Sequence, residues 1–150
     1  MARFDYDALV RALLLDAPKI GTPAARGHTT LLSTLVGQRI YAGVEFPDGY
    51  RPVTEAGNSA TGPGVRFETS MQPFGKGTAS LGVLQIRVWA VAASEGEARS
   101  VARAVWGHLY ESRTSTLKLI RETSAAAVSR EAEPRLWPMV SLVFESIVLV

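Results

Sequence analysis

The sequence predicts a single α+β domain, with an antiparallel or mixed sheet of about four to five strands and helices packed on one face. Apolar residues alternate from Leu84 to Ala90, which is the two-residue period of a half-buried strand. At Ser94 the period changes to three and four residues, which is typical of an amphipathic helix. The chain has 150 residues, of which 47% are hydrophobic, so residues 1–150 can form one domain with one core.

Two short helices and a short strand are predicted in the N-terminal part. Residues 5–15 begin with aspartates that can cap a helix, and Pro18 follows the expected end. Residues 31–37 form a second helix after a threonine pair, and its terminal Gly37 is a suitable C-cap. Residues 39–41 then have the character of a short strand.

The segment from Gly43 to Gly64 is the least regular part of the chain. It contains three prolines and few apolar residues, and structureless loops of this length are uncommon in compact domains. Two interpretations are open. The segment is either a disordered surface loop or an arm that becomes ordered against a partner.

The C-terminal part is predicted to hold four strands and the main helix. Residues 65–72 alternate as a half-buried strand, residues 74–80 supply a turn, and the strand that starts near Leu81 returns antiparallel. Ser94 and Glu97 have the spacing of a capping box for the helix that follows.

Two further strands are expected at residues 116–130 and 135–150. The second is the strongest strand candidate, and Pro138 near its start suggests an edge position or a bulge. Because it carries almost no charge, we expect either another strand or a neighbouring subunit to cover its edge.

The composition gives no sign of an active site. Lys and Arg number 16 against 14 Asp and Glu, for a net charge of +2, and no basic cluster stands out. There are no cysteines, and neither His28 nor His108 has a metal-ligand spacing. No catalytic motif, signal peptide or membrane-spanning apolar run is present. We therefore expect a non-enzyme without a metal or cofactor.

The sequence indicates interaction surfaces more clearly than it indicates an active site. Trp89 and Arg87 occupy the polar side of the central strand, which is the composition of an interface anchor. The alternative, that a second helix covers this side and Trp89 is core, is equally open. Trp89→Ala is expected to leave the monomer folded but to weaken assembly if the first interpretation holds.

Local sequence resembles the phage tail-terminator and tail-completion family. Those proteins begin with two helices followed by a "VG-x-RIY-x-G-V" segment and a proline-containing loop. The residues that match are Val36, Gly37, Arg39, Ile40, Tyr41, Gly43, Val44 and Pro47. The strand LQIRVWA and the helix SEGEARSVARAVWGHL also fit the family pattern.

The resemblance implies a structural virion protein of a long-tailed phage, assembled in the host cytoplasm. Such subunits form a ring, hexameric in the family, that ends tail-tube polymerisation and joins the tail to the head connector. The implied partners are other copies, the tail-tube protein, the head-closure or connector protein and the end of the tape-measure protein. DNA passes through the lumen without specific binding, so the channel wall is expected not to be strongly basic.

Subunit contacts in such a ring are expected to draw on seven residues: Arg87, Trp89, Phe46, Tyr50, Arg51, Phe74 and Lys76. Two alternatives to the terminator role stay open. One is another neck component, such as a head-closure protein or a tail-tube relative. The other is a cellular module that binds a ligand or nucleic acid.

Overall fold

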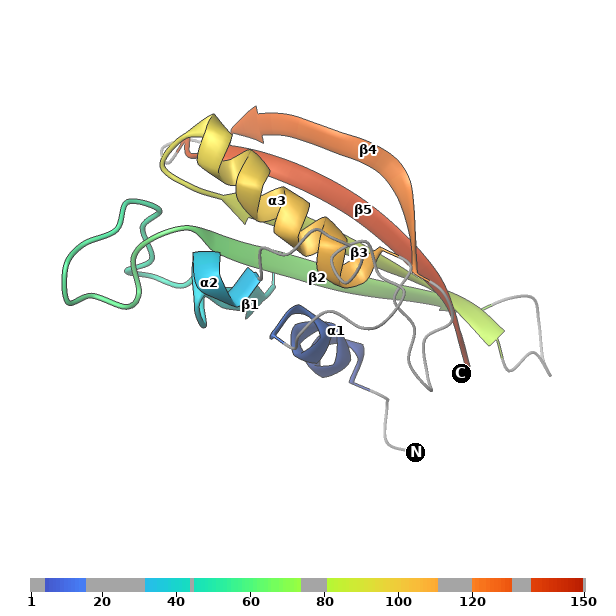
Figure 1. The fold of residues 1–150 in the computed structure, drawn as a ribbon. Helices are drawn as coiled ribbons and strands as arrows, with labels where there is room; N and C mark the ends of the chain where they lie inside the picture. The colour runs from blue at the N-terminus through green and yellow to red at the C-terminus, as the bar shows by residue number, and fades with distance from the viewer. Residues whose placement is uncertain are drawn as a thin grey trace.

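The computed structural model describes residues 5–15, 32–43, 45–73, 81–110, 120–130 and 136–149. Three helices and five strands lie within them (Figure 1). In chain order these are α1 (Tyr6–Leu15), α2 (Leu32–Val36), β1 (Ile40–Ala42), β2 (Gly64–Pro73), β3 (Leu81–Val91), α3 (Glu95–Leu109), β4 (Arg121–Arg130) and β5 (Pro138–Leu149).

The strands form one mixed sheet in the order β1-β2-β3-β5-β4. β1 is parallel to β2, and every other neighbouring pair is antiparallel. β3 and β4 therefore run in the same direction, joined by way of α3, and β5 is inserted between them. The predicted α+β class with a mixed sheet is confirmed.

The C-terminal strand β5 is internal, so the expected edge position at Pro138 is wrong. Pro138 is the first residue of β5 and pairs with Arg130. A proline is tolerated there because the missing N–H costs little at the start of a strand. The register shifts of the β4–β5 pair lie further along, on either side of Ser124. Strands β3 and β4, not a neighbouring subunit, cover the two sides of β5.

Helix boundaries follow the local signals. The Asp5 carboxylate accepts a hydrogen bond from the Ala8 N–H at 3.0 Å, which caps α1. The Ser94 hydroxyl accepts from the Glu97 N–H at 3.3 Å, which caps α3. Gly37 ends α2 with a φ of 55°, a conformation that glycine adopts at little cost.

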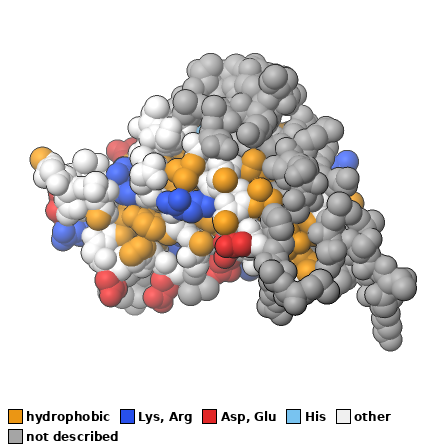
Figure 2. Space-filling view, turned by 90° about the horizontal axis from the view of Figure 1, so that it is seen from below, with side chains coloured by type: hydrophobic (Ala, Val, Ile, Leu, Met, Phe, Trp, Pro, Cys, Tyr) orange, Lys and Arg blue, Asp and Glu red, His pale blue; other side chains and the backbone are white. Residues whose placement is uncertain are grey.

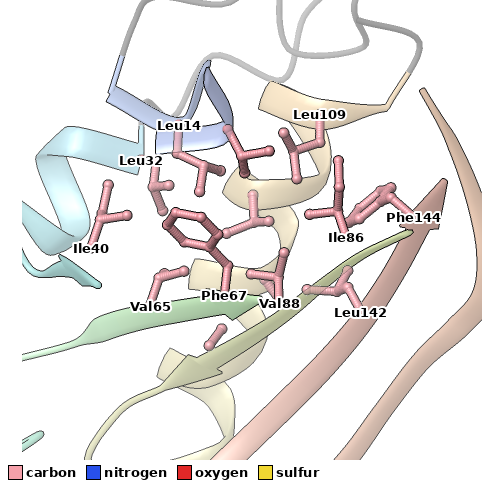
Figure 3. Packing of buried hydrophobic residues seen from close by; sticks show 14 of the residues in the cluster. Leu14, Leu32, Ile40, Val65, Phe67, Ile86, Val88, Leu109, Leu142 and Phe144 are labelled. Carbon is pink, nitrogen blue, oxygen red and sulfur yellow. The ribbon is translucent and has the colours of Figure 1, made fainter. Parts of the chain in front are cut away.

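All three helices pack on one face of the sheet and enclose the main core (Figure 3). This core joins Leu14 of α1, Leu32 of α2, Phe67 of β2, Leu109 of α3 and Phe144 of β5, each with no exposed surface. Burying one such side chain contributes about 1.5–3 kcal/mol. The predicted placement of the helices on one face is confirmed.

A buried histidine ties the three helices together. His108 of α3 is 3% exposed. Its Nε2 accepts a hydrogen bond from the Leu32 N–H at 3.3 Å, and its Nδ1 lies 3.0 Å from the Leu13 carbonyl oxygen. This geometry requires the tautomer with the proton on Nδ1. His108 thus provides hydrogen-bond partners for buried backbone groups at the start of α2 and in the last turn of α1.

Candidate subunit interface

The face of the sheet opposite the helices is the first candidate surface, and we call it the open face. No described helix packs on it, so the interpretation that a helix covers Trp89 finds no support in the described part of the chain. Strand alternation and register place these side chains on the open face: Tyr41, Arg66, Glu68, Ser70, Gln85, Arg87, Trp89, Ser141, Val143 and Glu145.

Trp89 is half-buried on the open face, next to a buried arginine. Arg66 is its cross-strand partner on β2 and is 7% exposed. The Arg66 guanidinium carbon lies 4.0 Å from the centre of the Trp89 ring, which is a cation–π contact. One side of the Trp89 ring is therefore occupied within the chain, and the remaining part is available to a partner.

Arg87 is exposed in the middle of the open face. Its Nε donates a hydrogen bond to the Gln85 side-chain oxygen at 3.1 Å, and its cross-strand neighbours are Glu68 and Val143. Glu68, Ser70, Gln85 and Arg87 also line a shallow depression of about 250 Å³. Opposite charges alternate here, so the surface is polar but nearly neutral.

The second candidate surface is the segment between β1 and β2, and we call residues 45–63 the arm. Its base is an aromatic cluster. Phe46 and Tyr50 stack with their ring centres 4.4 Å apart, and Trp137 meets Tyr50 edge-on at 5.6 Å. The cluster packs on Val91 and Met139 and forms a second, smaller core at one end of the open face.

Phe46 and Tyr50 were expected at subunit contacts, and the structure buries both inside the chain. Each side chain is only 3% exposed, so neither offers a surface to a neighbour. Arg51 is exposed, as an interface residue must be, and its Nη2 lies 3.2 Å from a Glu55 carboxylate oxygen. Phe74 and Lys76 lie outside the described residues.

Polar contacts hold the arm in one conformation. The Tyr50 hydroxyl donates to the Gly62 carbonyl oxygen at 2.7 Å. Arg39 donates from Nε to the Pro63 carbonyl at 2.8 Å and from Nη1 to the Ser59 carbonyl at 3.3 Å. Both sequence interpretations are therefore corrected, because the described arm is ordered and its own chain provides the contacts that order it.

The tip of the arm, residues 53–60, is exposed throughout. Figure 1 shows the arm, in teal and green, projecting beyond the end of the sheet. Val53 in the tip is 59% exposed, the largest exposed fraction among the exposed large hydrophobic residues of the described chain. The arm thus combines a rigid base with a projecting apolar residue.

The described residues show neither a metal site nor a continuous patch of basic side chains. They contain no group of three or more His, Cys, Asp and Glu side chains that could hold a metal ion. Figure 2 shows one face on which hydrophobic side chains lie beside separate basic and acidic ones, with no continuous basic patch over its described part. No described helix is long and apolar enough to cross a membrane.

Sequence reasoning missed three parts of this surface: Tyr41, Arg66 and Trp137. Arg66 could have been identified from the strand alternation. It lies between the apolar Val65 and Phe67, so it belongs to the polar side of its strand, as Trp89 belongs to the polar side of the next strand. Tyr41 and Trp137 could not, since their role depends on which distant aromatic rings they meet.

Comparison with solved structures shows that the fold occurs in other proteins. A chain in the virion of a native gene transfer agent particle has a similar fold, with a TM-score of 0.58. The two chains are 19% identical, and the match covers 81% of this chain and 86% of that one. At this identity the match shows a shared fold. No protein-family profile and no curated protein matches the sequence.

Proposed function

We propose that this protein is a virion structural subunit of the tail-terminator or tail-completion type. Its copies form a ring on the end of the tail tube, stop the tube from growing and present the surface that joins the head connector. The observation that carries the proposal is the fold shared over most of both chains with a virion component. The resemblance of residues 36–47 to the terminator family supplies the particular role.

Two unlike surfaces per subunit are what a ring requires, because each copy meets its two neighbours in a head-to-tail arrangement. The chain offers several. The open face is one, and the arm is another. β1 pairs only with residues 65–67 of β2, so the rest of that β2 edge has no strand beside it among the described residues. The outer edge of β4 is likewise unpaired there.

The distribution of charge on the open face suits a ring through which DNA passes without being bound. Cross-strand neighbours on the open face pair Glu68 with Arg87 and Arg121 with Glu145, so charges of opposite sign lie side by side. Such a surface attracts phosphate weakly, because tight binding needs several uncompensated cations. On this proposal DNA passes the ring without specific binding, and the protein performs no catalysis and needs no cofactor.

Growth of purified tail tubes tests the terminator role directly. Tubes incubated with this protein should carry one ring at one end in negative-stain micrographs, and fresh tube protein should no longer extend that end. Stacks of many rings would instead indicate a tail-tube protein. Binding to the connector with none to the tube would indicate a head-closure protein, the alternative in the same class.

A ring structure on the tail also tests the channel. We expect its wall to carry mixed or few charges. Lys and Arg side chains concentrated on the wall would contradict free passage of DNA.

A further inference from the structure

Two side chains at the start of β1 hold the arm. Arg39 immediately precedes β1 and Tyr41 lies in its middle, while Ile40 between them is buried in the main core. Tyr41 meets the Tyr50 ring edge-on, with 5.9 Å between the ring centres, on the side of the arm that leaves β1. Arg39 bonds instead to the side of the arm that returns to β2. Two residues that are close in sequence therefore contact both sides of the arm.

Arg39 donates three hydrogen bonds to backbone carbonyl groups, each from a different nitrogen. Its Nε donates to Pro63 at 2.8 Å, where the arm rejoins the sheet, and its Nη1 donates to Ser59 in the tip at 3.3 Å. Its Nη2 donates to Leu35 at 3.4 Å, in α2. The planar guanidinium thus joins the arm to the helical layer. Lysine cannot reproduce this arrangement, because it has one compact ammonium group in place of a rigid fork of donors.

The backbone of the arm leaves space for this guanidinium. A Cβ atom added at Gly62 would come 2.8 Å from the Arg39 Nη2 atom and 3.0 Å from its Cζ atom. The Gly62 N–H donates to the Arg51 carbonyl oxygen at 2.8 Å, which bonds the two sides of the arm to each other. Arg39 therefore lies against the arm at the point where its two sides are joined.

The position of the tip depends on contacts at the base of the arm. The base packs on the second core, whereas residues 53–60 of the tip are exposed. A small change of angle at the base moves the tip by a larger distance. The main core lies on the helix-covered face and includes neither Arg39 nor the arm. Loss of the Arg39 side chain should therefore change the position of the tip more than the packing of the main core.

We propose that Arg39 is a positioning residue for ring assembly, which holds the arm in the orientation that brings its tip against a neighbouring copy. The inference rests on the proposed ring, and it identifies the side chain that prepares one of the contact surfaces. Binding by a pre-ordered loop avoids most of the entropy that a flexible segment loses. When only a fraction of the chains hold the arm in place, the apparent affinity falls in proportion to that fraction.

Amide hydrogen exchange tests whether Arg39 holds the arm. In Arg39→Ala the Gly62 N–H should exchange about 10- to 100-fold faster, as expected for the loss of hydrogen bonds from a charged group. Amides of β3 should keep their natural rates, and Arg39→Lys should resemble Arg39→Ala. Arg99→Ala is the matched control, because Arg99 also donates two hydrogen bonds, both to Glu95, but lies on α3 beside β4. It should leave exchange in the arm unchanged.

Assembly of the same variants tests whether the position of the arm matters to the ring. Both Arg39 variants should need about tenfold more protein for half-maximal capping of tail tubes, and about tenfold more for self-association followed by mass measurement. The assays are run where urea denaturation shows the variants to be folded. Ile86→Val controls for stability, because it removes a methylene group from the main core without touching the arm. It should assemble at the natural concentration.

The outcomes separate this role from the proposed function. Normal assembly of Arg39→Ala or Arg39→Lys, unchanged exchange at Gly62, or an equal assembly defect in Ile86→Val would overturn the positioning role and leave the function standing. The reverse result is a natural protein that forms rings but never caps tubes, with ring formation weakened in both Arg39 variants. It would keep the positioning role and reject the terminator function. A natural protein that neither self-associates nor caps tubes overturns both.

Discussion

The Tyr50 ring lies directly on the backbone of Gly64, where the arm rejoins the sheet. A Cβ atom added at Gly64 would come 2.6 Å from the Tyr50 hydroxyl oxygen and 2.8 Å from its ring carbons. Because Tyr50 is itself buried between Phe46 and Trp137, it cannot move aside without disturbing the second core. This contact fixes the direction in which the arm leaves the domain.

Gly64→Ala is therefore expected to lower the free energy of unfolding by about 1–3 kcal/mol, as overpacking of a buried site does. Gly96→Ala is the matched control. Gly96 lies in the first turn of α3, and a Cβ there meets nothing within 4 Å, so alanine should be neutral or slightly stabilising. Urea denaturation of both variants measures the difference. Equal stabilities would show that Tyr50 relaxes freely.

Alkaline pH should destabilise the arm through Tyr50. Burial raises the pKa of this phenol well above its ordinary value, more than the nearby Arg39 charge lowers it. The folded state thus keeps the proton at a pH where the unfolded chain loses it. Stability from Tyr50 is fully present below pH ~10 and falls as the pH rises above that value.

Tyr50→Phe removes both the ionisable group and the hydrogen bond to Gly62. Its free energy of unfolding should be lower than that of the natural chain at pH 8, by about 0.5–1.5 kcal/mol. The gap should narrow between pH 10 and 11, because only the natural protein has the ionisation. A gap that stays constant with pH would contradict the assignment of the alkaline loss to Tyr50.

Local parts of this fold could be predicted from sequence, and non-local parts could not. The Leu81–Leu109 strand and helix follow from periodicity and from the Ser94 cap, which involve neighbours in the chain. The position of β5 depends on a pairing choice between strands that all have suitable patterns. The burial of Phe46 and Tyr50 depends on Trp137, far away in sequence. Nothing in the Gly- and Pro-rich composition of the arm distinguishes an ordered loop from a disordered one.

His108→Leu should destabilise the protein by about 1–3 kcal/mol, although leucine fills a similar space. The substitution leaves the Leu32 N–H and the Leu13 carbonyl group buried without the imidazole, and unsatisfied buried groups carry that cost. The specific readout is amide hydrogen exchange, in which the Leu32 N–H should exchange faster than its neighbours do. Unchanged exchange at Leu32 would show that the imidazole is only a packing element.

Substitutions at Arg87 and Trp89 should distinguish the contribution of the open face to stability from its contribution to assembly. Arg87 is exposed, and within the described part of the chain its side chain hydrogen-bonds to Gln85 alone. Arg87→Ala should therefore change the free energy of unfolding by less than about 0.5 kcal/mol. Trp89 is half-buried, contacts the second core and stacks with Arg66. Trp89→Ala should therefore lower the free energy of unfolding as well as weaken assembly, although the monomer is still expected to fold.

Urea denaturation and mass measurement on assembled rings provide the two readouts for this pair. If the open face contacts a neighbour, both variants should weaken the ring, and only Trp89→Ala should also shift the denaturation midpoint. Arg66→Lys extends the comparison, because lysine keeps the charge but loses the planar stacking on the indole. A stability loss in Arg66→Lys with normal ring formation would assign the Arg66–Trp89 contact to the fold alone. Full assembly by Arg87→Ala and Trp89→Ala would exclude the open face as a ring contact and leave the arm and the sheet edges to provide both neighbours.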